Sequence, residues 1–145
     1  MESTGIPELD RTLNHLDTWL HGIMTEMGRD NREEAYAVLH ATLRALRDRL
    51  SVDEAAHLAA QLPVVVRGLF YDGWDPSKTP LRERHLEQFL GHIRDALANR
   101  INLEPDAGAR AVFSVLAQRV SAGEIDDVVG CLPTELRSLW PAAAR

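Results

Sequence analysis

The sequence has little of several residue types, and each shortage excludes a class of protein. Its 145 residues contain a single cysteine, Cys131, so no disulfide can form within the chain. No stretch approaches the roughly 18 consecutive apolar residues that a membrane helix needs. The first ten residues, MESTGIPELD, lack the basic and apolar segments of a signal peptide. We therefore expect a cytoplasmic protein that does not bind membranes.

Positive charge is also scarce. Lys and Arg number 16 against 22 Asp and Glu, which gives a formal net charge of −6. Proteins that bind nucleic acid usually have a basic balance, because contacts with phosphates supply much of their affinity. Glycine is scattered over nine positions and forms no phosphate-binding loop. We expect no nucleic-acid partner, whereas the 45% of hydrophobic residues is ample for a packed core.

The most informative feature that is present is an internal repeat. The stretch SVDEAAHLAAQLPVVVRGLF (51–70) aligns with SAGEIDDVVGCLPTELRSLW (121–140) after a shift of 70 positions. Without any gap, fifteen of the 62 residues from 9 to 70 are identical to the residue 70 positions later. This pattern indicates a tandem duplication with repeats near 1–70 and 71–140.

Each repeat has the pattern of helices. Six apolar residues near the N-terminus are spaced 4, 3, 4, 3, 4 and share one face of a helix that Gly28 can end: Leu9, Leu13, Leu16, Leu20, Ile23 and Met27. Asp30 with Glu33 predicts the start of the next helix. No segment shows the alternation typical of a strand.

Serine, threonine and proline mark further helix starts. Ser51 with Glu54 predicts a capping box, in which each residue's side chain bonds the other's backbone, and Ser121 with Glu124 repeats it. Prolines indicate the remaining helix starts: Pro63 with its counterpart Pro133, Thr79-Pro80, and Pro105. We predict an all-α helical bundle built from a duplicated unit of about 70 residues and four helices. Because such a small half is marginal alone, residues 1–145 are expected to form a single compact unit.

The junction between the repeats, residues 71–79, lies in the stretch LFYDGWDPSKTPL (69–81). Its Asp-Gly, Asp-Pro and Thr-Pro pairs are typical of turns and a helix start. Four aromatic residues are associated with the repeat ends: Phe70, Tyr71, Trp74 and Trp140. We expect them to fill the space between the repeats; the alternative is an exposed patch that contacts a partner.

Two long stretches carry a family resemblance. VLHATLRALRDRLSVDEAAHLAAQLPVVVRGLFYDGWDPSKTP and the later LAQRVSAGEIDDVVGCLPTELRSLW resemble the bacterial family called domain of unknown function 2267. The similarity covers nearly the whole chain. It implies a small helical bacterial protein and carries over no activity, substrate or cofactor.

Two charged positions recur in both repeats without a local reason, Glu34 with Glu104 and Arg67 with Arg137. One interpretation is an ion pair within each repeat. The other is that each arginine donates to free carbonyl groups near the proline that follows the third helix. We favour these structural roles over an anion-binding site.

Metal ligation has partial support. Glu54 and His57 form a Glu-x-x-His pair, a spacing found in di-metal helical bundles. The second repeat has Glu124 and Asp127 instead, and Glu54 is expected to be engaged in its cap. His15 and His85 share a repeat position at the edge of an apolar stripe. No three of these form a ligand set by spacing, so we predict no metal and no cofactor, with Glu54, His57, His15 and His85 as the lesser candidates.

The remaining chemistry is sparse. Cys131 precedes Leu132-Pro133 in an apolar context and is expected to be a buried, unreactive thiol. No other catalytic constellation is assembled in the sequence. The sequence therefore favours a non-enzymatic helical module that binds a protein partner or itself as a homo-oligomer. The alternative is a small-ligand or metal-binding protein with its site between the repeats.

Overall fold

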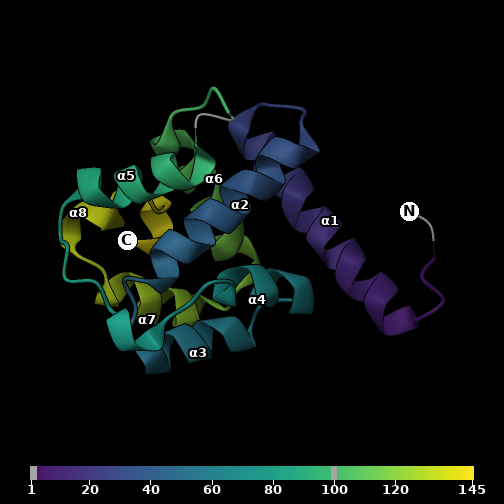
Figure 1. Ribbon diagram of the computed structural model, residues 1–145, viewed down its shortest axis with the longest axis horizontal. Helices are drawn as coiled ribbons and strands as arrows, with labels where there is room; N and C mark the ends of the chain where they lie inside the picture. The colour runs from purple at the N-terminus through teal and green to yellow at the C-terminus, as the bar shows by residue number, and fades with distance from the viewer. Residues whose placement is uncertain (1–2, 99–100) are drawn as a thin grey trace.

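The computed structural model describes residues 3–98 and 101–145, and these residues form helices and connecting segments without a strand (Figure 1). This confirms the all-α prediction. The α-helices are α1 (Pro7–Met27), α2 (Arg32–Arg47), α3 (Val52–Ala60), α4 (Val64–Tyr71), α5 (Leu86–Leu97), α6 (Pro105–Arg119), α7 (Ala122–Cys131) and α8 (Thr134–Arg137), with 3-10 turns η1 (Pro76–Lys78) and η2 (Ala142–Ala144). No helix among these residues is long and apolar enough to cross a membrane.

Helix α1 ends as its sequence predicts, at Gly28 with a left-handed φ of 66°. The cap of α2 differs from the prediction, which placed it at Asp30. Asn31 is the cap instead, because its side chain accepts a hydrogen bond of 3.1 Å from the Glu34 backbone N–H. The predicted starts after Pro63 and at Pro105 are confirmed.

The helix predicted to open at Thr79-Pro80 begins later, at Leu86. The backbone N–H of Leu81 donates a 2.7 Å hydrogen bond to the carbonyl of Asp48, just after α2. The segment before α5 is therefore tied to the end of α2 and is not free to coil. His85 becomes the N-cap, and its backbone N–H donates to Oε1 of Gln88.

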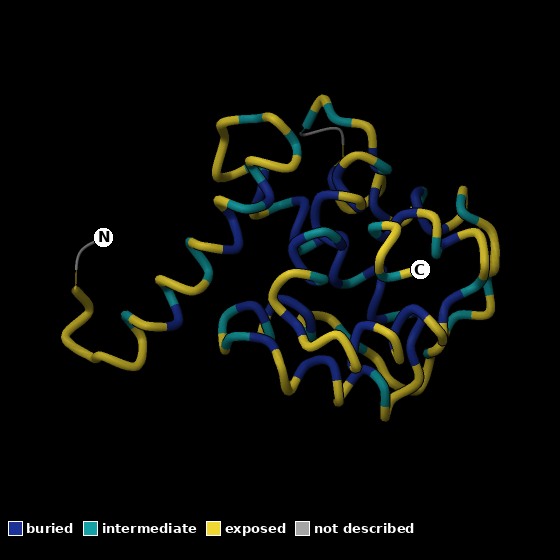
Figure 2. The backbone as a smooth tube through the Cα atoms, turned by 180° about the vertical axis from the view of Figure 1, so that it is seen from behind, coloured by how far each residue is buried: buried dark blue, intermediate teal, exposed yellow. Residues whose placement is uncertain are grey.

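The helices of the two sequence halves are interleaved. Helix α2 crosses the middle of the molecule and packs against α1, α4, α5 and α6. Helix α1 packs on α6, just as α5 packs on α2, and α3 packs on α7. The buried side chains form one continuous core that draws on both halves. The N-terminal end of α1 projects from this body, which is why its turns are mostly exposed (Figure 2).

The four aromatic residues at the repeat ends divide into two groups. Phe70 and Trp140 are 0% and 1% exposed, so neither is available as a partner surface. Trp140 stacks on Phe113 with ring centroids 4.2 Å apart, inside the core. Tyr71 and Trp74 are half-buried and stack on each other at 5.3 Å. The junction aromatics thus pack mainly against local neighbours.

Candidate functional site

The candidate site lies where α3 and α7 pack together. Each helix begins with the predicted serine cap: Ser51 Oγ accepts from the Glu54 backbone N–H at 3.1 Å, and Ser121 Oγ accepts from that of Glu124 at 3.3 Å. The glutamate side chains, however, do not complete the predicted capping boxes. Instead, the carboxyl group of Glu54 on α3 and that of Glu124 on α7 lie close to each other across the contact between the two helices.

Helices α3 and α7 run in opposite directions. Gln61, at the end of α3, holds the start of α7: its Oε1 accepts from the Ser121 backbone N–H at 2.9 Å and its Nε2 donates to Ser121 Oγ at 3.0 Å. Residues 51–60 and 121–130 therefore face each other with Glu54 opposite the second turn of α7. This orientation brings a residue of the first repeat next to its own counterpart in the second.

Three carboxylates converge there. One oxygen each from Glu54, Glu124 and Asp127 lies within 4.8 Å of the others. Glu124 is 8% exposed, and its Oε2 is buried without a hydrogen-bond partner. Oε1 of Glu54 is buried and unpartnered in the same way. Two acidic oxygens are thus withdrawn from water, and within the described residues no N–H group or hydroxyl is directed at them. The carboxyl groups of Glu54 and Glu124 can only hydrogen-bond each other, which requires a shared proton, or bind a common cation.

The electrostatics of the cluster reflect this arrangement. Burial, together with the neighbouring carboxyl groups of Glu54 and Asp127, raises the pKa of Glu124 to about 7, and His57 opposes the rise. Without a bound cation, Glu124 is therefore only about half protonated near pH 7 and holds its proton at lower pH. A divalent cation would replace that proton and satisfy the same oxygens.

The donor set suits a hard cation. Carboxylate oxygens are the preferred ligands of Mg²⁺, Ca²⁺ and Mn²⁺. His57 follows Glu54 by one helical turn on α3 and is exposed, so an imidazole lies at the rim of the cluster. Backbone groups of two capped helices fix Glu54 and Glu124, whereas Asp127 is exposed and free to adjust.

Cys131 differs from its prediction. It is exposed rather than buried, since it stands at the last turn of α7 at the surface. Partial desolvation of its thiol, and then the charges of Glu54, Asp127 and Glu124, raise the pKa of Cys131. Partial burial and, after it, the acidic cluster therefore both disfavour the thiolate of Cys131.

The histidines at the shared repeat position lie elsewhere. Nδ1 of His85 is 2.9 Å from Oε2 of Glu135, whose Oε1 accepts from the Leu86 backbone N–H. His15 lines a separate small cavity beside Trp19. Of the four lesser metal candidates, the structure brings only Glu54 and His57 to the carboxylate cluster.

The recurring charges take local roles. Arg67 donates through Nε to the carbonyl of Ala59 at 2.9 Å and through Nη2 to that of Leu62 at 3.0 Å. Arg137 does the same for Leu132 and Gly130. Both arginines satisfy carbonyl groups around the end of the preceding helix, the second of the two interpretations.

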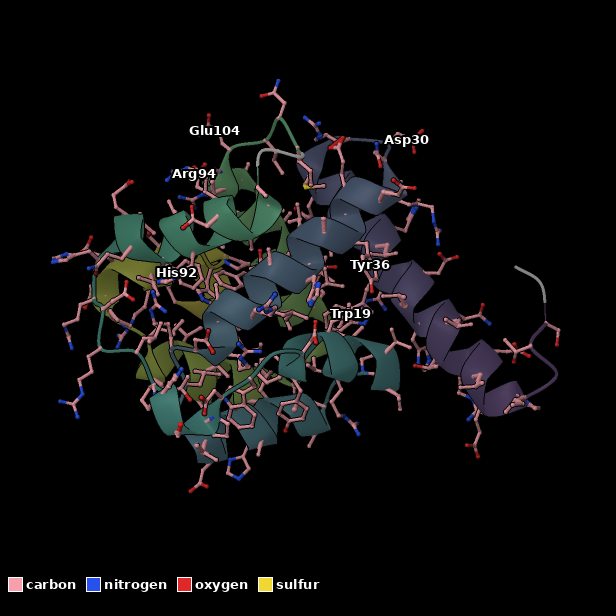
Figure 3. All side chains as sticks on the ribbon, viewed as in Figure 1. Trp19, Asp30, Tyr36, His92, Arg94 and Glu104 are labelled. Carbon is pink, nitrogen blue, oxygen red and sulfur yellow. The ribbon has the colours of Figure 1, made fainter. Side chains whose placement is uncertain are left out.

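The repeated glutamates differ from each other. Glu34 pairs with Arg29, with Nε to Oε2 at 2.8 Å and Nη2 to Oε1 at 2.9 Å. Glu104 stands exposed before α6 near the edge of the molecule (Figure 3). The predicted pairing of Glu34 with Arg67 is absent, because Arg67 is engaged with backbone carbonyls.

Comparison with known proteins agrees with the resemblance. Residues 16–139 match the family described as "Uncharacterized conserved protein (DUF2267)". The chain belongs to the DUF2267 family. The matched region of this DUF2267 protein includes both serine caps and all three carboxylates of the cluster. A search of the curated proteins finds no match.

Sequence reasoning identified Glu54 but missed its partners. The signal was present, because Glu124 is the residue 70 positions after Glu54 and both follow a capping serine. What the sequence did not contain is the crossing of α3 and α7, which depends on how the halves interleave.

Proposed function

We propose that this DUF2267 protein is a non-enzymatic binding module that holds a divalent cation between α3 and α7. Glu54, Glu124 and Asp127 provide the ligands. The observation that carries the proposal is the pair of buried, unpartnered oxygens on Glu54 and Glu124, with a third carboxylate oxygen within 4.8 Å. This is the metal-binding alternative of the sequence analysis, with a changed set of residues.

The electrostatic free energy of the site favours a bound cation. Two adjacent carboxylates in a partly desolvated site repel each other, and each has lost hydrogen bonds to water. A divalent ion would offset both costs at once. Among the cations that prefer oxygen ligands, Mn²⁺ is the first-row transition metal. Because imidazole suits transition metals and His57 stands at the rim, we favour Mn²⁺ over Mg²⁺ as the bound ion.

The inferred tandem duplication accounts for the position of the site, at the contact between α3 and α7. Counterpart helices begin 70 residues apart: α3 at Val52 and α7 at Ala122, α4 at Val64 and α8 at Thr134. The packing of α1 on α6 matches that of α5 on α2. A near two-fold relation of this kind supports a single fused unit in which a glutamate of each repeat meets its counterpart.

Isothermal titration calorimetry of the full chain, stripped with chelator, tests the proposal. Mn²⁺ is expected to bind with one ion per chain, and Glu124→Gln to weaken binding at least about tenfold by removing a charged ligand. Glu87→Gln is the matched control, since Glu87 is an exposed glutamate on α5. Absence of saturable heat with Mn²⁺, Ca²⁺ and Zn²⁺ would rule the proposal out.

A second candidate function, self-association, rests on a separate observation. Ile6 and Leu9 are 52% and 44% exposed on the projecting end of α1, and Val64 is 64% exposed. The backbone N–H of Val65 donates to Thr12 Oγ1, which brings Val64 close to that end of α1. Sedimentation equilibrium tests this candidate: Leu9→Glu should leave only monomer if the apolar surface pairs two copies, and a wild-type monomer at high concentration excludes it.

A further inference from the structure

Two arginines at equivalent repeat positions have different surroundings. Arg49 follows α2, its side chain is 1% exposed, and its guanidinium lies 5.5 Å from the centroid of the Phe89 ring. Its Nη2 is 3.8 Å from Oε2 of Glu83. In this half, the arginine therefore rests on an aromatic ring and faces a carboxylate supplied by the chain.

The counterpart, Arg119, is exposed. It borders a cavity of about 200 Å³ together with Trp19, the sequence counterpart of Phe89. Glu83 has no structural counterpart there, because Leu13, 70 positions earlier, lies within α1 whereas Glu83 precedes α5. Among residues 3–98 and 101–145, Arg119 forms no hydrogen bond and no ion pair through its side chain.

The rest of the cavity is suited to an anion. His15 borders it, and its ring likewise has no partner among the described residues. Trp19, labelled in Figure 3, forms a buried wall at 3% exposure, and Pro63 adds an apolar surface. Thr18 and Gln61 complete the lining, so no acidic side chain competes for Arg119.

We propose that this cavity binds a small organic carboxylate. The ligand's carboxylate pairs with Arg119, as the Glu83 carboxylate pairs with Arg49, and His15 is a second nitrogen donor. A cavity of about 200 Å³ admits a molecule of a few carbon atoms. This site is separate from the carboxylate cluster, and its test does not depend on the metal.

The test is a titration of the full chain with malonate, followed through the indole N–H signal of Trp19 in ¹H–¹⁵N NMR spectra. The Trp19→Phe variant assigns that signal. We expect a saturable shift with a Kd on the order of 1–10 mM. Sodium sulfate at matched ionic strength is expected to have a clearly weaker effect, and an equal effect would overturn the assignment to a carboxylate.

Two variants and one control make the result specific. Arg119→Gln should weaken malonate binding at least about tenfold. Thr18→Glu should place a carboxylate in the site from within the chain and likewise prevent malonate from binding. Arg94→Leu removes an exposed charge from α5, whose residues do not line the cavity, and should bind as the wild type does. If Arg119→Gln or Thr18→Glu binds malonate as strongly as the wild type, the proposal is wrong.

Discussion

Glu54 and Glu124 occupy the same position in two serine-capped helices, and their carboxyl groups meet across the contact between α3 and α7. A charged residue next to its own repeat counterpart is unfavourable, since like charges repel. A structure that nevertheless places them together needs a proton or a cation at that point.

Without metal, the pH should control stability through Glu124. Its pKa rises from an ordinary value of 4.5 to about 7, so the folded chain holds the proton more tightly than the unfolded chain does. The stabilising contribution is fully present below about pH 4.5 and is lost as the pH rises through 7. We therefore expect the Tm, measured with chelator present, to fall by several degrees between pH 5 and pH 8 on account of this group.

Glu124→Gln should abolish that part of the pH dependence, because the amide does not titrate. Its Tm relative to the wild type should be higher at pH 8 than at pH 5. Glu87→Gln, at an exposed position, should follow the wild-type curve. Identical curves for Glu124→Gln and the wild type would show that the buried carboxyl group does not titrate in this range.

A glycine at the centre of the molecule should resist enlargement. A Cβ at Gly108 of α6 would lie 3.0 Å from Cγ1 of Val38 on α2, the residue's own repeat counterpart. A methyl group at Gly108 would therefore crowd the Val38 side chain where the helices cross. We expect Gly108→Ala to destabilise by about 1–3 kcal/mol through overpacking, which outweighs its gain in helix propensity.

Gly91→Ala is the matched control, because Gly91 also lies within a helix and nothing is within 4 Å of the added Cβ. It should stabilise by about 0.5–1 kcal/mol. Val38→Ala combined with Gly108→Ala should recover part of the loss. Urea denaturation of the wild type, these three variants and Val38→Ala alone measures the differences, and additive effects of the Val38 and Gly108 changes would argue against a direct clash.

Arg67 should matter for stability through its hydrogen bonds rather than its charge. It donates to the carbonyls of Ala59 and Leu62 at the end of α3. Arg67→Leu keeps much of the apolar stem but leaves both carbonyls without this donor, so we expect a loss of about 1–3 kcal/mol. Arg11→Leu, measured in the same urea titration, should have little effect. Equal free energies of unfolding for the two variants would mean that water, in place of Arg67, hydrogen-bonds the carbonyls of Ala59 and Leu62.

The interleaving of the halves predicts cooperative unfolding. Because α1 packs on α6 and α5 on α2, neither half contains a complete core of its own. Circular dichroism and tryptophan fluorescence should report coincident transitions for the full chain. The fragment 1–72 should show little helix and no cooperative melting, and a well-folded fragment would contradict the single-unit prediction.

The local features of the fold followed closely from the sequence. The leucine spacing of α1, the αL glycine at its end, the serine caps of α3 and α7 and the proline starts are all short-range signals. The errors arose where a distant segment decides the outcome. Residues 80–85 stay extended because Leu81 bonds to Asp48, and the sequence of that segment alone does not reveal this partner.

The candidate site was only half predictable for the same reason. Its residues recur 70 positions apart, and Glu54 was identified as a potential ligand. The spacing of Ser51 and Glu54 predicts a helix cap, but it does not indicate which helix crosses α3 or in which direction. The antiparallel contact with α7, held by Gln61 and Ser121, is what joins Glu54 to Glu124.

The most direct measurement is an anomalous difference map from a crystal of the full chain grown or soaked with Mn²⁺. We expect a single strong peak between α3 and α7, within about 2.0–2.4 Å of oxygens from Glu54, Glu124 and Asp127. If the map is empty there and the two glutamate oxygens approach to about 2.5–2.7 Å, they share a proton. The cluster between α3 and α7 would then be a protonated carboxyl pair and not a metal site.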